Sequence, residues 1–223
     1  MFRIKICGVT NVADAVLAAE AGADAVGLNF YEKSPRCVSA SVAATIGSAL
    51  SDRIDPVGVF VNASADAISK VCDVAFLRIV QLHGDEQPDF VKLLIRDPAI
   101  TIIRAWGIDP RGMDAVYEDV LACYGAGRMP DAVLVDAAVA GMYGGTGRMI
   151  DWKRLINYEE SIGKIPLILA GGLAPENVAE AIRVVRPHAV DVASGVESSP
   201  GKKDPAKVRD FVTAAREAFA NLK

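Results

Sequence analysis

The sequence predicts an α/β protein built as a single closed (β/α)₈ barrel, and three observations support this prediction. Short apolar segments typical of buried strands alternate along the whole chain with amphipathic segments typical of helices. Hydrophobic residues make up 52% of the sequence, which suits strands that are buried on both faces. About eight strand–helix units fit into 223 residues when their connections are very short, as they are in such barrels.

An open doubly wound sheet is the alternative architecture. Such a sheet usually carries a Gly-x-Gly-x-x-Gly fingerprint after its first strand, and Cys7-Gly8-Val9-Thr10 does not match it. No linker or low-complexity stretch divides the chain, so one domain spanning residues 1–223 is expected.

The elements are expected in strict alternation. Strands are predicted at 2–7, 25–30, 56–61, 77–82, 100–105, 132–136, 166–170 and 189–193. Helices are predicted at 11–21, 40–50, 65–71, 89–95, 113–123, 175–185 and 204–222. Asn11 and Asp204 suit the N-cap position, and Pro175 suits the first turn of its helix. The helix after the sixth strand is only weakly indicated, and the glycine-rich stretch 141–147 precedes it.

Charge and composition limit the kinds of molecule that the protein is expected to bind. The net charge of −4 argues against a general nucleic-acid binder or a protein of anionic membranes. No apolar run approaches the ~20 residues of a membrane span, and no signal peptide is visible. The four cysteines form no Cys-x-x-Cys pair, and with two histidines there is no zinc-ligand spacing. A reduced, cytoplasmic protein without a metal is therefore expected.

Ionisable residues are rare where the predicted strands end, which is the face of a parallel barrel where ligands bind. Cys7 ends the first strand, His83 follows the fourth, and Asp136 ends the sixth. A carboxylate after a buried strand is costly without a partner or a function. His83 either contacts a substrate or holds neighbouring loops through its ring nitrogens. His188 precedes the eighth strand, so we expect it at the opposite face in a structural role.

The seventh and eighth strands both end in glycine-containing turns, at Gly171-Gly172 and at Ser194-Gly195. Loops after these two strands form the recurring phosphate site of such barrels, so we predict a phosphate cradle there. Arg36 follows Ser34-Pro35 in the loop after the second strand. Its planar guanidinium suits a carboxylate, although a solvated surface arginine is the alternative.

Together these residues resemble the phosphoribosylanthranilate isomerases of tryptophan biosynthesis over nearly the whole chain. The matching stretches lie in order at 5–10, 22–27, 34–36, 57–62, 80–84, 134–136, 144–147, 151–152, 170–173 and 191–197. The resemblance implies a (β/α)₈ barrel, no cofactor, a small phosphosugar substrate and a monomer or homodimer. The implied reaction is an Amadori rearrangement, which converts an aminoaldose phosphate into an aminoketose phosphate.

The resemblance also implies a role for each residue. The general base falls on Cys7, the general acid on Asp136 and the arginine for the anthranilate carboxylate on Arg36. The phosphate-binding backbone falls on Gly171, Gly172, Ser194 and Gly195, with His83, Gln81 and Asp191 in supporting positions. We interpret Gly144, Gly145, Thr146 and Gly147 as part of a lid that excludes water.

The chemistry sets opposite requirements for the two catalytic groups. Asp136 can donate a proton only if burial keeps its carboxyl protonated near neutral pH. Cys7 can accept a proton only as a thiolate, and an ordinary thiol with a pKa of about 8.5 is a few per cent ionised at pH 7.

Three other functions compete with this one. A metal-dependent sugar-phosphate epimerase would need several His and Asp ligands at strand ends, where only His83 is available among histidines. The similar aminoaldose isomerase of histidine biosynthesis uses paired aspartates, whereas the first strand here carries Cys7. A non-catalytic phosphate-binding scaffold would be expected to lack Cys7 or Asp136, and this chain has both.

Overall fold

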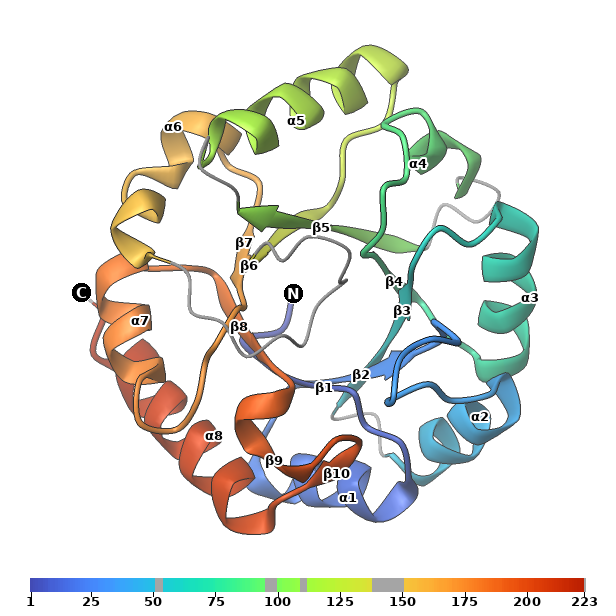
Figure 1. Cartoon of the computed structure of the whole chain (residues 1–223), viewed down its shortest axis with the longest axis vertical. Helices are drawn as coiled ribbons and strands as arrows, with labels where there is room; N and C mark the ends of the chain where they lie inside the picture. Colours follow the sequence, from blue (N-terminus) through green and yellow to red (C-terminus); the bar gives the residue numbers. More distant parts are fainter. Residues whose placement is uncertain (51–53, 95–99, 109–111, 138–150, 223) are drawn as a thin grey trace.

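Eight parallel strands close into a barrel in the order β1-β2-β3-β4-β5-β6-β7-β8, with helices around it (Figure 1). The computed structural model describes residues 1–50, 54–94, 100–108, 112–137 and 151–222. The strands are β1 (Ile4–Cys7), β2 (Ala25–Asn29), β3 (Asp55–Phe60), β4 (Ile79–Leu82), β5 (Thr101–Ile108), β6 (Ala132–Ala137), β7 (Leu167–Leu169) and β8 (Ala189–Val192). The closed (β/α)₈ architecture confirms the fold class predicted from the sequence.

The helices form the outer layer. They are α1 (Val12–Ala21), α2 (Ala40–Ala49), α3 (Ala65–Ala75), α4 (Phe90–Leu93), α5 (Asp114–Ala126), α6 (Tyr158–Ile162), α7 (Val178–Val185) and α8 (Pro205–Ala220). Asn11 caps α1 through the Asp14 amide, and Asp204 caps α8 through the amides of Ala206 and Lys207, as predicted. Among the described residues, no helix has the length and apolar character needed to cross a membrane.

Strand alternation separates two cores. Ile4 and Ile6 of β1 pack outward in the main core with the helices, whereas Lys5 reaches the interior, where it contacts β4 and β8. A second apolar cluster fills part of the barrel interior. It includes Phe2, Val57, Ile103, Leu134 and Ile168. The barrel interior therefore holds an apolar cluster and, nearer the carboxyl ends of the strands, a layer with the charged side chains Lys5 and Asp191.

Pro175 does not begin a helix, so this prediction is wrong. Helix α7 starts at Val178, and Pro175 lies in the turn before it. The side chain of Asn177 accepts a hydrogen bond from the Ala174 amide and donates one to the Gly172 carbonyl. These bonds hold residues 172–177 as an ordered loop, which delays the start of the helix.

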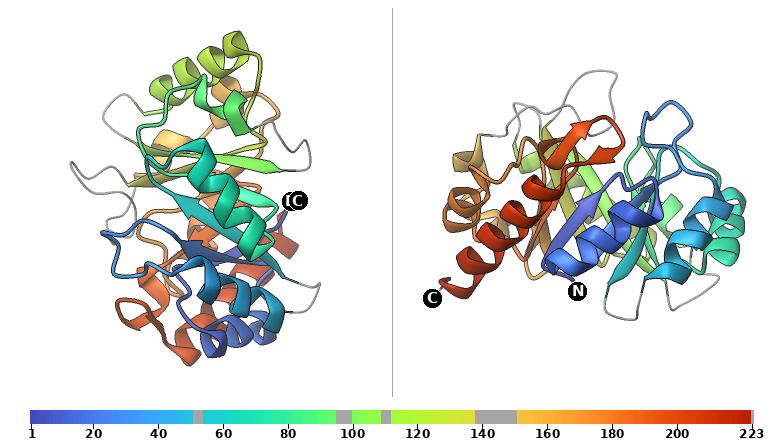
Figure 2. Two further views of the ribbon diagram at one scale, coloured as in Figure 1. Left: turned by 90° about the vertical axis from the view of Figure 1, so that its right-hand side faces the viewer. Right: turned by 90° about the horizontal axis from the view of Figure 1, so that it is seen from below.

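One further element was not expected. After the short 3₁₀ helix η3 (Ser194–Val196), the chain forms a hairpin of β9 (Glu197–Ser199) and β10 (Lys202–Lys203) before α8. In the right-hand view of Figure 2 this hairpin lies at the end of the barrel away from the N terminus. The hairpin brings Glu197 and Lys203 to the carboxyl ends of β1 and β8.

His188 lies at the start of β8, away from the carboxyl ends of the strands. Its Nδ1 accepts a hydrogen bond from the Leu167 amide and lies 3.3 Å from the Tyr158 hydroxyl oxygen. These contacts fit the structural role expected for it.

Candidate active site

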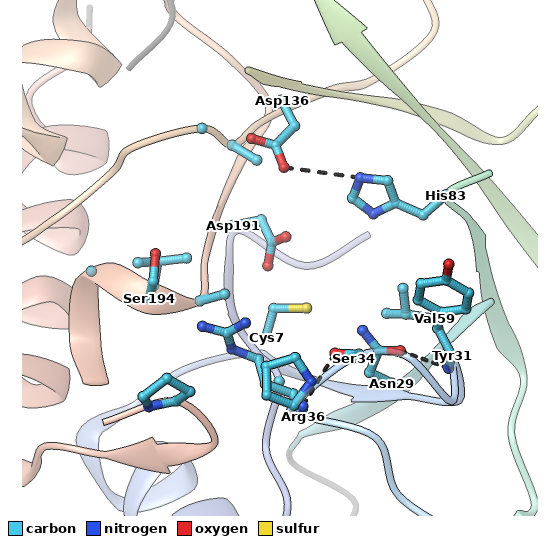
Figure 3. Close-up of a pocket in the computed structure, with 18 of the residues that line it drawn as sticks. Cys7, Asn29, Tyr31, Ser34, Arg36, Val59, His83, Asp136, Asp191 and Ser194 are labelled. Atoms are coloured by element: carbon cyan, nitrogen blue, oxygen red, sulfur yellow. Dashed lines mark hydrogen bonds and ion pairs between the residues drawn. The ribbon is translucent and has the colours of Figure 1, made fainter. Parts of the chain in front are cut away.

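A cavity of about 400 Å³ opens at the carboxyl ends of the strands. The predicted residues Cys7, Arg36, His83, Asp136 and Asp191 all line it, together with the two glycine-containing turns after β7 and β8. In the view of Figure 3, Asp136 and Cys7 lie on opposite sides of Asp191. Gln81 is fully buried and lies beneath His83 rather than in the cavity wall.

Cys7 is the last residue of β1 and is partly exposed to the cavity. Its partner in the sheet is Gly27, where a Cβ atom would lie 2.6 Å from the Cys7 Sγ. Glycine at position 27 is therefore required for the thiol to occupy this place. Burial raises the pKa of the Cys7 thiol and Asp191 raises it further, although Lys5 and Lys203 lower it. The unliganded protein thus holds less thiolate than an ordinary cysteine would.

Asp136 is buried near the end of β6. Its Oδ1 accepts a hydrogen bond of 2.7 Å from the Ala137 amide, and its Oδ2 lies 3.9 Å from the His83 Nε2. Burial raises the pKa of the carboxyl to about 6, against the opposing effect of the Ala137 amide. This shift has the direction that the buried strand pattern predicts. About a tenth of the molecules carry the proton at pH 7.

Lys5 was not identified from the sequence, yet it contacts two of the supporting residues, Gln81 and Asp191. Its side chain is fully buried, and its Nζ donates to Gln81 Oε1 at 2.9 Å and to Asp191 Oδ1 at 3.0 Å. Burial would lower the pKa of Lys5, but Asp191 and Cys7 outweigh it, so the ammonium stays charged. The period-two alternation of the first strand places Lys5 on the same face as Cys7, and this signal could have revealed it.

His83 follows β4 and lies in the cavity wall. Its Nδ1 is 2.9 Å from the Gln81 Nε2. Burial, assisted by Lys5, lowers the pKa of His83 to about 4, so the imidazole is neutral at physiological pH. Of the two roles left open by the sequence, this position supports contact with a bound molecule.

Arg36 is not a solvated surface arginine. Its Nε and Nη2 donate to the two carboxylate oxygens of Glu197 at 2.9 and 2.7 Å. Glu197 is buried and also accepts a bond from Lys203 Nζ, which in turn donates to the Cys7 carbonyl at 2.6 Å. Although burial opposes it, Arg36 and Lys203 lower the pKa of Glu197 and keep it ionised.

Glu197 and Lys203 were not predicted as site residues, because they lie on the unexpected hairpin. The pairing fixes the guanidinium at the rim of the cavity, with Nη1 taking no part in it.

The two glycine-containing turns lie against each other. Gly171 and Gly172 have positive φ angles of 82° and 67°, a conformation that favours glycine. Ser194 and Gly195 begin η3, and a Cβ atom on Gly195 would collide with the Leu173 carbonyl oxygen. All four residues line the cavity as bare or nearly bare backbone. This arrangement suits an anion such as a phosphate.

The proposed lid residues Gly144, Gly145, Thr146 and Gly147 lie outside the described residues. Within the described ranges, no group of three or more His, Cys, Asp and Glu side chains could hold a metal ion. The described site combines a carboxyl with a raised pKa, a thiol, a buried ammonium and a fixed guanidinium. Such a set is suited to moving protons within an anionic substrate.

Comparison with known families gives a clear match. The sequence model of N-(5'phosphoribosyl)anthranilate (PRA) isomerase matches residues 4–214. A curated N-(5'-phosphoribosyl)anthranilate isomerase of Acidithiobacillus ferrooxidans is 46% identical over 217 residues, covering 97% of this chain and 98% of the relative.

Solved structures give the same match. Phosphoribosyl anthranilate isomerase of Thermotoga maritima is 39% identical and superposes with a TM-score of 0.85, covering 97% of this chain and 100% of the other. A phosphoribosyl anthranilate isomerase solved in complex with reduced 1-(o-carboxyphenylamino)-1-deoxyribulose 5-phosphate is 38% identical, with a TM-score of 0.82. In that comparison the match covers 97% of this chain and 100% of the other.

Proposed function

The chain belongs to the N-(5'-phosphoribosyl)anthranilate isomerase family, and from this premise we propose the roles of its site residues. It is an isomerase of tryptophan biosynthesis. Its reaction is the Amadori rearrangement of N-(5'-phosphoribosyl)anthranilate to 1-(2-carboxyphenylamino)-1-deoxyribulose 5-phosphate. The observation that carries the proposed roles is the joint presence in one cavity of Cys7 and Asp136, whose carboxyl pKa is raised to about 6.

Asp136 is proposed as the general acid that opens the furanose ring. The ring oxygen must gain a proton as its bond to C1 breaks, while the nitrogen lone pair forms the Schiff base. The pKa of about 6 leaves a useful fraction of Asp136 protonated near neutral pH. Because Oδ1 already accepts the Ala137 amide, Oδ2 is the oxygen placed to deliver the proton.

Cys7 is proposed as the general base. The protonated Schiff base must lose the proton on C2, which gives an enolamine that tautomerises to the ketone. The positive charge that develops on the substrate nitrogen favours the thiolate, and it counteracts the burial that raises the pKa of the free thiol. Cys7 then acts without forming a covalent bond to the sugar.

The two ends of the substrate are proposed to bind at opposite parts of the cavity. The turns at Gly171-Gly172 and Ser194-Gly195 bind the phosphate, and Arg36, held by Glu197, binds the anthranilate carboxylate. His83, Gln81 and Asp191 support the two catalytic groups. Separating the two anionic groups in this way would orient the sugar between the acid and the base.

The wider properties are also proposals. We treat residues 1–223 as one domain, because β8 pairs with β1 and α8 packs on α1. The partner is a small phosphosugar rather than a nucleic acid or a membrane, in line with the net charge of −4. The protein is a monomer or a homodimer, and its four free cysteines support a cytoplasmic location.

Replacement of Cys7 tests the proposed base. In a coupled assay with N-(5'-phosphoribosyl)anthranilate, Cys7→Ala should lower kcat by at least about a hundredfold with little change in substrate binding. Cys37→Ala, which removes an exposed thiol outside the cavity, is the matched control and should keep turnover.

Near-normal turnover by Cys7→Ala would remove Cys7 as the base. Mass spectrometry during turnover gives a second reading. A sugar adduct trapped on Cys7 would show a nucleophile instead.

A further inference from the structure

A chain of polar side-chain contacts runs from Asp191 through Lys5 and Gln81 to His83. Its two end residues, Asp191 and His83, line the cavity and are labelled in Figure 3. We propose that Lys5, acting through Gln81, holds His83 in the tautomer whose proton is on Nε2, and that this tautomer reserves the Asp136 proton for the substrate. Lys5 and Gln81 are then positioning residues. The consequence for catalysis rests on the proposed role of Asp136, whereas the tautomer itself does not.

Lys5 fixes which way the Gln81 amide faces. An ammonium group carries three donors and no acceptor, so the atom of Gln81 that lies 2.9 Å from Lys5 Nζ must be the oxygen. The reversed amide would place an NH₂ group against the buried ammonium, with two donors facing each other and the Gln81 oxygen turned away. Asp191, 3.0 Å from the same Nζ, keeps the ammonium in place and balances its charge.

Gln81 then decides the state of His83. With its oxygen directed at Lys5, the amide presents its NH₂ group to the His83 Nδ1 at 2.9 Å. That nitrogen must accept, so it carries no proton. Because burial lowers the pKa of His83 to about 4, the ring is neutral and its single proton lies on Nε2.

The tautomer matters because the His83 Nε2 faces the proposed acid. Its distance of 3.9 Å from Asp136 Oδ2 is too long for a hydrogen bond, so an Nε2–H would remain available to donate to an oxygen of a bound substrate. A protonated Nε2 cannot accept the Asp136 proton. With the opposite tautomer, the Nε2 lone pair would be an acceptor that can attract the O–H of protonated Asp136 into a hydrogen bond and turn it away from the substrate.

Nitrogen-15 NMR of the protein labelled at histidine reads the tautomer directly. The chain has two histidines, so His188→Gln assigns both sets of signals. At pH 8 the wild-type His83 should show a protonated Nε2 and an unprotonated Nδ1. A wild-type protein with the proton on Nδ1 would overturn the proposal.

Gln81→Glu is the sharpest variant. It keeps the side-chain length and an oxygen acceptor for Lys5, but it replaces the donor facing His83 with an acceptor. We expect a proton on Nδ1 in the NMR spectrum and a decrease in kcat of at least about tenfold, because the unprotonated Nε2 can then accept a hydrogen bond from the Asp136 O–H and divert it from the substrate. An unchanged spectrum, with the proton on Nε2 alone, would contradict the proposal.

Two further variants keep the inference testable if Gln81→Glu fails to fold. Gln81→Met removes the donor at similar volume, and Lys5→Met frees the amide to rotate, so each should give a mixture of tautomers. A single Nε2–H form in either folded variant would count against the proposal. Because the spectra are recorded without substrate, failure of the proposed function appears in the assay alone, and failure of this inference appears in the spectra.

Discussion

Asp136 and Cys7 face the same cavity at the ends of two strands, and burial raises the pKa of both. The same physical effect has opposite consequences for their proposed roles. It favours the protonated form that the acid needs, whereas it disfavours the ionised form that the base needs. Two neighbouring lysines, Lys5 and Lys203, lower the pKa of the Cys7 thiol and offset part of this effect, but the pKa stays raised. Burial alone is enough to tune an acid, but a buried anionic base also needs nearby positive charge.

The difference also determines which form of the protein is active. The reaction needs Asp136 in its protonated form and Cys7 in its ionised form. Near neutral pH, Asp136 is above its pKa of about 6 and Cys7 is below its raised pKa. The active combination is therefore a minor form of the protein. The two fractions change in opposite directions between the two pKa values, and their product is flat there. We therefore expect a bell-shaped profile of kcat/KM, with its acidic limb near pH 6 from Asp136.

Replacing the general acid should have the largest effect on catalysis. Asp136→Asn keeps the shape and the acceptor for the Ala137 amide but cannot donate an acidic proton. We expect kcat to fall by about 10²–10⁴-fold with the fold intact. Steady-state kinetics measures the fall in kcat, and circular dichroism checks that the variant is folded. Retained turnover in a correctly folded variant would show that another group opens the ring.

The same variant should raise stability. The folded-state pKa of Asp136 is about 6 against 3.8 when unfolded, so the folded state binds the proton more tightly. The wild type therefore loses stability as pH rises from about 4 to 6, and Asn does not titrate. At pH 7 Asp136→Asn should exceed the wild type by on the order of 3 kcal/mol, and below pH 4 the difference should shrink.

Urea unfolding of both proteins at pH 4, 5, 6 and 7 measures this trend. A stability difference that is independent of pH would mean that the Asp136 carboxyl is not perturbed by burial.

Removing a lysine near the base should lower kcat by less than removing the acid does. Lys203→Met takes away a positive charge that lowers the pKa of Cys7, so less thiolate forms and kcat should fall by about tenfold. The loss should be greatest at low pH and partly recover as pH rises. Lys203→Arg keeps the charge and is the matched control. Equal loss in both variants at every pH would point to packing rather than charge.

Much of the site could be predicted from the sequence because strand ends in a parallel barrel share one face. Cys7, His83 and Asp136 end or follow buried strands, and the structure places all three in one cavity. Lys5 was also accessible to this reasoning, through the alternation of its strand. Glu197 and Lys203 were not, because a short hairpin of three and two residues leaves little pattern in the sequence.

By itself, the sequence determined the order of strands and helices, the ligand-binding face and the types of chemical group on it. These follow from local periodicity, which the chain carries in every segment. The tertiary structure decided how those groups are charged. Lys5 meets Gln81 of β4 across the barrel and Asp191 of the neighbouring strand β8, at sequence separations of 76 and 186 residues, and Arg36 meets Glu197 161 residues away. Burial and long-range pairing set the pKa of an ionisable group, and neither exists until the barrel has closed.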